Sequence, residues 1–212
     1  MNAGNIEDDA FTAFIVATVA GDDVTAIRLL DASPLLTKHR ASSGATRQYS
    51  ERNFFDRIRH YIYEGDTALH MAAAAFQTSI VETLITRGAE VRARNRRGAE
   101  PLHYAVDGGP GVSAWDPGAQ AKIIAKLIRA GADPNAIDKS GVAPLHRAVR
   151  NRCAAAVKAL IEGGADPLAP NRNGSTPMLL ATQTTGKSGA GSSEAKEQQE
   201  EILRLLDEHG AK

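Results

Sequence analysis

The chain has 212 residues, and its 25 basic and 25 acidic side chains give a formal net charge of zero at pH 7. This length allows one domain with a substantial core or a short repeat array, and the balanced charge by itself indicates no class of partner. The single cysteine excludes an intramolecular disulfide and a cysteine-based zinc cage, and it favours a reducing compartment.

The first segment with a helical pattern is the apolar run at residues 10–21, AFTAFIVATVAG. Glu7, Asp8 and Asp9 precede it, where a secretory signal carries positive charge. Its twelve residues are also too few to span a bilayer. We therefore expect a cytoplasmic protein without a membrane segment, beginning with two helices at residues 11–19 and 24–30.

A basic and aromatic segment follows at residues 38–63, with six Lys and Arg against two acids. Within it, residues 47–63 read RQYSERNFFDRIRHYIY and hold five of the nine Phe and Tyr residues of the chain. We expect a short helix at 50–58, capped by Ser50, and a strand at 60–63. Two compatible interpretations are open: the aromatic rings form a lid on the helical stack, or Arg and Tyr together form a contact surface. The side chains expected to face inward are Phe54, Phe55 and Ile58, and those expected to face outward are Arg47, Arg57 and Arg59.

From residue 65 the chain repeats itself. The segments GDTALHMA, GAEPLHYA, GVAPLHRA and GSTPMLLA begin at residues 65, 98, 141 and 174, at separations of 33, 43 and 33 residues. Apolar residues at helical spacing lie between them, for example at 80, 81, 84 and 85. Thr with a following Pro suits a helix start, and a glycine after the second helix suits a left-handed helix end. The pattern predicts two helices per repeat, which bury their apolar faces only by stacking. The glycines at the second helix ends are Gly88, Gly131, Gly164 and Gly210.

A 33-residue period with the pattern T-P-L-H-x-A resembles the ankyrin repeat. The resemblance implies an all-α solenoid of stacked helix-loop-helix repeats with short β-hairpin fingers, about five repeats in one domain. We expect a degenerate capping repeat at 10–37, an insertion at 38–63, repeats at 64–97, 98–140 and 141–173, and a C-terminal capping repeat at 174–212. Glu100 and Ala143 replace the threonine of the pattern. A Thr–His hydrogen bond is therefore expected only between Thr67 and His70.

Two further insertions, near residues 107–120 and 184–196, fall between the two helices of a repeat and are rich in Gly and Ser. This composition predicts loops. Trp115, the only tryptophan, is expected to fold back and hold the first loop in place.

The sequence does not point to an active site. Residues 181–188, ATQTTGKS, match a loose phosphate-loop pattern but lack the preceding strand and the immediately following helix that such a loop needs. His70, His103 and His146 recur because the repeat recurs, and stacked repeats hold them too far apart to share a metal. Cys153 is expected to be a buried structural residue. We therefore expect no enzyme, no catalytic residue, no metal and no cofactor.

The unusual surface feature is the segment 92–97, with four arginines in six residues. The resemblance places it at a tip between repeats and implies that partners contact the tips and the exposed positions of the first helices, including Ala74 and Ala75. We predict a protein–protein interaction module, monomeric alone, that binds an acidic partner. A nucleic-acid-binding protein using the same surface is the alternative, and a small ligand in the loops at 38–63 or 107–120, or a basic edge with no partner, also stays open. The predicted contact residues are Arg47, Tyr49, Arg57, Arg59, Tyr61, Arg92, Arg94, Arg96, Arg97, Lys139, Arg150 and Arg172.

Overall fold

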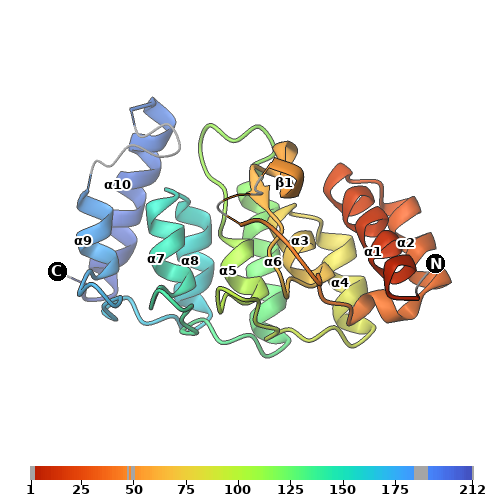
Figure 1. Ribbon diagram of the computed structural model, residues 1–212. Coiled ribbons are helices and arrows are strands. Elements are labelled where there is room, and N and C mark those ends of the chain that lie inside the picture. The colour runs from red at the N-terminus through yellow and green to blue at the C-terminus, as the bar shows by residue number, and fades with distance from the viewer. Residues whose placement is uncertain (1–2, 47, 49–50, 184–190, 212) are drawn as a thin grey trace.

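The computed structural model describes residues 3–46, 48, 51–183 and 191–211, and these form one row of stacked helical pairs (Figure 1). The predicted all-α repeat solenoid is therefore confirmed. Among the described helices, none is both long and apolar enough to cross a bilayer. The pairs are α1 (Ala3–Ala20) with α2 (Asp23–Ala32), α3 (Ala68–Ala74) with α4 (Thr78–Thr86), α5 (Pro101–Ala105) with α6 (Pro117–Arg129), α7 (Pro144–Arg150) with α8 (Ala154–Glu162), and α9 (Pro177–Thr182) with α10 (Ser193–Glu208).

These helices begin and end at residues that act as local capping signals, as the sequence predicts. Proline occupies the first position of α5, α7 and α9, where its missing N–H is not needed. The Asp116 carboxylate accepts a hydrogen bond from the Ala119 N–H, at 2.9 Å, and so caps α6. Gly88 and Gly131 follow α4 and α6 with φ of +81° and +101°, the left-handed conformation predicted for them.

The core is continuous along the array because each repeat supplies the same apolar positions. Leu69, Leu102 and Leu145 lie at equivalent points of α3, α5 and α7 and are at most 1% exposed. They belong to one buried cluster that extends from Phe11 to Ala211. Each helical pair therefore shields its neighbours, as stacked repeats require.

The insertion at 38–63 differs from the expected helix and strand. Its described part contains two single 3-10 turns at Glu51–Asn53 and Asp56–Ile58, with β1 (Phe54–Phe55) between them and β2 (His60–Tyr61) after them. The helix predicted at 50–58 is therefore wrong, whereas the strand is confirmed at His60–Tyr61. Phe54 pairs with Tyr61 across the two antiparallel strands, and their rings lie 4.6 Å apart. Aromatic pairs of this kind favour extended backbone over helix.

The tips between repeats are turns rather than paired strands within the described residues. The side-chain oxygens of Asn95, Asp138 and Asn171 each accept backbone N–H groups two and four residues further along the chain. Neighbouring tips are joined by backbone hydrogen bonds, such as Lys139 N–H to the Arg97 carbonyl at 2.9 Å. The fingers expected from the resemblance therefore take this turn form.

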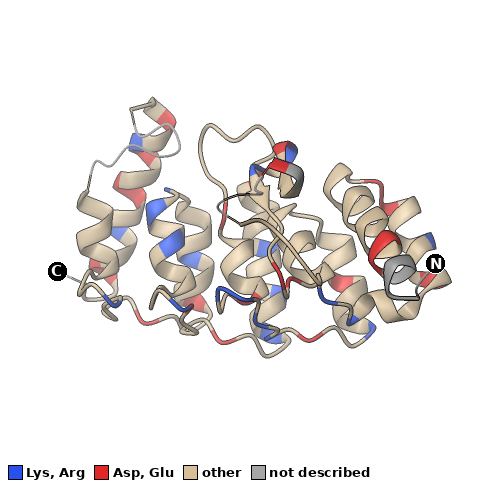
Figure 2. Cartoon of the chain, in the orientation of Figure 1, with Lys and Arg blue, Asp and Glu red and all other residues tan. Residues whose placement is uncertain are grey.

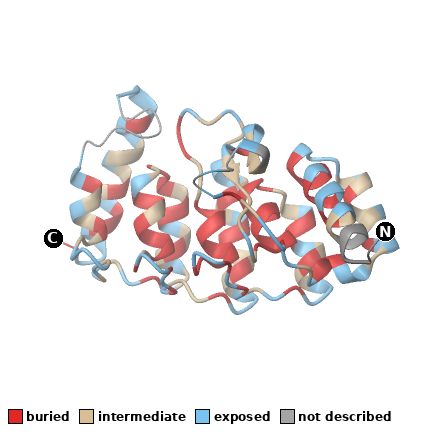
Figure 3. Cartoon of the chain, in the orientation of Figure 1, coloured by how far each residue is buried: buried red, intermediate tan, exposed pale blue. Residues whose placement is uncertain are grey.

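The first helices divide the array into two parts (Figure 3). Every residue of α3 and α5 is buried. In α7 and α9, by contrast, Arg150 is exposed and Leu179 is 49% exposed. We call α3–α6 the closed half and α7–α10 the open half. Of α3, α5, α7 and α9, only the two first helices of the open half, α7 and α9, keep residues of this face exposed.

Candidate partner-binding groove

The insertion closes the first half of the array by packing onto its first helices. Ile58 is 8% exposed and belongs to the common core, and Phe55 packs against that core. The His60 ring lies 4.4 Å from the ring of Tyr104 on α5. Ala74 and Ala75, which the resemblance placed on the contact face, are buried. They are therefore not exposed positions at which a partner could make contact.

A buried polar cluster fixes the insertion to the tip that precedes α5. The fully buried Asp66 carboxylate accepts hydrogen bonds from the Tyr63 N–H at 2.6 Å, the Asn95 amide at 2.8 Å and the Tyr104 hydroxyl at 2.8 Å. Burial and the nearby Asp66 carboxylate raise the pKa of Tyr104 well above its usual value. The hydroxyl therefore stays protonated and keeps its role as donor.

The four arginines of the tip at 92–97 are exposed, but each is engaged within the chain. Arg92 donates to the Asp133 carboxylate at 3.2 Å, and Arg94 donates to the carbonyls of Gly98 and Ile137. Arg96 donates to the Ala45 carbonyl of the insertion. Arg97 donates to the Tyr63 hydroxyl at 2.9 Å and lies over the same ring at 4.9 Å. This cluster therefore joins the insertion and two neighbouring tips, a role that its composition did not indicate.

Other predicted contact residues carry free charges. Among the described residues, no hydrogen bond or ion pair holds the exposed side chains of Arg57, Arg59, Lys139, Arg150 and Arg172. Tyr61 is half-buried against Phe54. Arg47 and Tyr49 lie outside the described residues. The free cations therefore belong to the insertion, to the two later tips and to α7.

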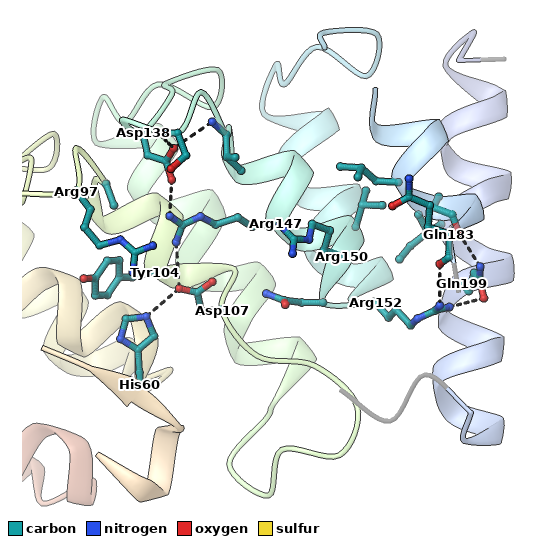
Figure 4. A pocket seen from close by; sticks show the side chains of 18 of the residues that line it. His60, Arg97, Tyr104, Asp107, Asp138, Arg147, Arg150, Arg152, Gln183 and Gln199 are labelled. Carbon is teal, nitrogen blue, oxygen red and sulfur yellow. Dashed lines mark hydrogen bonds and ion pairs between the residues drawn. The ribbon is translucent and has the colours of Figure 1, made fainter. Parts of the chain in front are cut away.

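A groove of about 570 Å³ opens beside α7, and Figure 4 shows the side chains around it. It extends from the insertion across α5 and α7 to α9 and α10. Four arginines and two aspartates line it, which leaves it basic. The lining charged residues are Arg97, Asp107, Asp138, Arg147, Arg150 and Arg152.

The end of the groove beside the insertion is a network of paired charges, which we call the charged end: His60, Asp107, Asp138 and Arg147. The Asp107 carboxylate accepts from His60 Nε2 at 2.9 Å and from Arg147 at 3.3 Å, and Arg147 also donates to Asp138 at 2.7 Å (Figure 4). His60 Nδ1 lies 2.7 Å from the Tyr61 carbonyl. Burial would raise the pKa of Asp107, but Arg147 and His60 outweigh it and hold that pKa below its usual value.

The opposite end is held by amide groups, and we call it the amide end: Arg152, Gln183 and Gln199. The buried Arg152 guanidinium donates to the Gln183 carbonyl at 3.2 Å and to the Gln199 side chain. Gln199 in turn donates to the Ala181 carbonyl at 2.6 Å. Arg150 lies between the two ends and, among the described charged residues of the groove, is the one without a partner.

The three repeated histidines bind backbone in the next repeat. Nδ1 of His70, His103 and His146 accepts the backbone N–H three residues earlier, at 3.1–3.2 Å, and Nε2 donates to Ala99, Val142 and Ala169 carbonyls, respectively. The predicted Thr67–His70 side-chain hydrogen bond is present at 2.9 Å. Burial lowers the pKa of His103 to about 4. Among the described residues, no group of three or more His, Cys, Asp or Glu is placed to hold a metal ion.

The loop at 107–116 is anchored by Gln120 of α6. Its side-chain oxygen accepts from Trp115 Nε1 at 3.0 Å and from the Cys153 thiol at 2.7 Å. Burial raises the pKa of Cys153 to about 11, so the thiolate is disfavoured. Trp115 and Cys153 thus have the structural roles predicted for them. Most of the phosphate-loop pattern, residues 184–188, lies outside the described residues.

Comparison with known families agrees with the helical pairs. A family model described as "Ankyrin repeats (3 copies)" matches residues 112–212, and one described as "Ankyrin repeat" matches residues 64–96. None of the curated proteins gives a significant match to the chain.

Proposed function

Because the chain belongs to the ankyrin repeat family, whose repeats generally act as protein–protein interaction modules, we propose that it is a non-enzymatic module that binds an acidic segment of a partner protein. The contact surface combines the later tips, the open half and the outer side of the insertion. The division into capping repeats at 10–37 and 174–212 and internal repeats at 64–97, 98–140 and 141–173 is part of this proposal. Cytoplasmic location and a monomeric state stay predictions.

The observation that carries the proposal is the guanidinium of Arg150 in a basic groove, which has no partner in the part of the chain that the structure describes. Lys139 and Arg172 add two exposed cations, without a partner among the described residues, at the tips that precede α7 and α9. Acidic side chains gather elsewhere, on α10, where Glu194, Glu197 and Glu200 are exposed (Figure 2). The neutral chain therefore has separate basic and acidic regions, and the basic region suits an acidic ligand.

The test is affinity capture of partners by a variant with Lys139→Glu, Arg150→Glu and Arg172→Glu. We expect captured protein to fall at least about tenfold, because an arginine that is a hot spot of an interface contributes about 2 kcal/mol or more. The matched control is Lys122→Glu with Arg129→Glu on α6, which reverses two exposed cations that lie outside the groove and have no partner in the described ranges. Equal capture by the triple variant and the wild type would contradict the proposal.

Nucleic acid is the second candidate from the sequence, and it rested on arginine beside aromatic rings. In the closed half such a pair, Arg97 with Tyr63, is occupied internally. The alternative is tested by titrating single-stranded DNA and RNA at low salt. Affinity that falls steeply as salt rises would favour it.

A further inference from the structure

We propose that the groove of the open half binds a short, extended peptide segment whose acidic side chain pairs with Arg150 and whose neighbouring apolar side chain lies at the amide end. This inference rests on the proposed function and adds the anchoring residue and the chemistry of the segment.

Most charged side chains that line the groove already have a partner within the chain. The Asp107 and Asp138 carboxylates both pair with Arg147, and Asp107 also accepts a hydrogen bond from His60. Arg97 is held by Tyr63, and Arg152 is held by Gln183 and Gln199. An acidic ligand therefore meets no free carboxylate in the groove, and Arg150 offers it all its N–H donors.

Arg150 is flanked by two other arginines of the groove. In Figure 4 its guanidinium lies between Arg147 and Arg152, which come from the same helix and the turn that follows it. Both neighbours are fixed by their own partners and are not free to replace it. The planar guanidinium matches a carboxylate with two parallel hydrogen bonds. One acidic side chain is thus expected at this point, not a diffuse acidic run.

Beyond Arg150, apolar and amide side chains line the groove. Leu180 on α9 is half-buried and lines the groove, and the buried Val149 and Ile202 also belong to the lining. The exposed Gln183 side chain makes no hydrogen bond within the described residues and suits a peptide backbone group. An apolar side chain next to the acid would cover Leu180 and gain its burial.

The size and the two ends of the groove select the length of the ligand. A volume of about 570 Å³ is within the range of pockets that enclose small ligands, roughly 300–1,000 Å³. The hydrogen bond between His60 and Asp107 bounds the groove at the insertion, and the contact between Arg152 and Gln199 bounds it at α10. This space suits a few residues of extended chain better than the face of a folded partner.

The experiment is selection of a random octapeptide display library on the immobilised full chain, followed by the same selection on Arg150→Glu. For the wild type we expect a consensus with Asp or Glu next to an apolar residue. Arg150→Glu is expected to replace that acid by Lys or Arg. The Lys122→Glu control is expected to retain the acidic consensus. Circular dichroism melts confirm that both variants are folded.

A second measurement uses the best selected peptide and its Glu→Gln or Asp→Asn version. On the wild type we expect the amide version to bind about 10- to 100-fold more weakly, the usual effect of losing a charged hydrogen bond. On Arg150→Ala the two versions are expected to bind equally.

The outcomes separate the two proposals. An acidic consensus that Arg150→Glu leaves unchanged overturns the groove anchor but leaves an acidic-partner module intact. A consensus without any acid counts against both. No enrichment at all overturns the groove as a peptide site, while the capture experiment with the triple variant still decides the proposed function.

Discussion

In the closed half, every residue of α3 and α5 is buried and the insertion contacts α5 through His60, whereas in the open half α7 and α9 keep part of their first-helix face in solvent. One repeat position makes the contrast concrete: it is the buried Ala74 in α3, the charge-paired Asp107 after α5, and the exposed Arg150 and Gln183 in the open half. Equivalent positions in stacked repeats thus have different roles when an insertion covers some of them. A contact surface inferred from repeat alignment must first be corrected for what the insertion covers.

The arginines differ in the same way between the two regions. At the tip before α5, four neighbouring arginines connect tips and insertion, although all four are exposed. In the open half, Arg150 is exposed and has no partner among the described residues. An exposed arginine is therefore not necessarily a free one, and local density of arginine is a poor guide to a binding site.

The largest expected effect tests the burial of the closed half. Tyr104→Ala should lower the free energy of unfolding by about 3–5 kcal/mol, because it removes a fully buried ring and the donor to Asp66. Leu180→Ala, at the equivalent position of the open half, should lower it by less than about 2 kcal/mol because Leu180 is only half-buried. Urea unfolding followed by circular dichroism measures both. Similar losses for the two variants would show that the halves are not covered differently.

The next effect concerns the junction of the halves, where His103 on α5 donates to the Val142 carbonyl before α7. Burial lowers the pKa of His103 from 6.5 to about 4 in the folded chain. Below pH 6.5 the unfolded chain therefore binds a proton that the folded chain does not. The contribution of His103 to the free energy of unfolding is fully present above that pH and is lost as the pH drops towards 4. His103 alone should remove about 3 kcal/mol across this window.

The measurement is the free energy of unfolding from pH 7 to pH 4.5, for the wild type and His103→Gln. In the variant, the free energy of unfolding should fall less steeply as the pH is lowered, because one of the three buried histidines no longer contributes. His70 and His146, whose pKa values burial also lowers, account for the pH dependence of stability that remains in the variant. An identical slope in both proteins would mean that His103 is not kept neutral at the junction.

The smallest expected effect compares one tip arginine with the groove arginine. Arg97→Ala should reduce stability by about 0.5–1 kcal/mol, because it removes the hydrogen bond to Tyr63 and the stacking on its ring. Arg150→Ala should change stability by less than about 0.5 kcal/mol, since nothing in the described chain depends on it. Denaturant midpoints of the two variants provide the comparison. A larger loss for Arg150→Ala would give that residue a structural role and weaken the case for the groove.

Much of the fold could be predicted from local patterns. The spacing of apolar residues, the prolines at helix starts and glycines such as Gly88 act within a few residues, so the helical pairs were found near their observed positions. The helix predicted at 50–58 failed because Phe54 and Phe55 pair with His60 and Tyr61, a contact that its local pattern did not favour. The aromatic segment is evident in the sequence, but its docking on Tyr104 is evident only in the structure.

The candidate site depended on contacts between distant segments. Arg96 binds the carbonyl of Ala45 and Arg97 binds Tyr63, over separations of 51 and 34 residues. No spacing within 92–97 distinguishes these engaged arginines from Arg150, because a charge is free or paired only after the chain brings its partner into reach. The repeat pattern sufficed for the stacked helices, since helix formation and capping are local. The closed half, the groove and its unpaired guanidinium can be identified only from the three-dimensional fold, because each depends on where the insertion lies on the array.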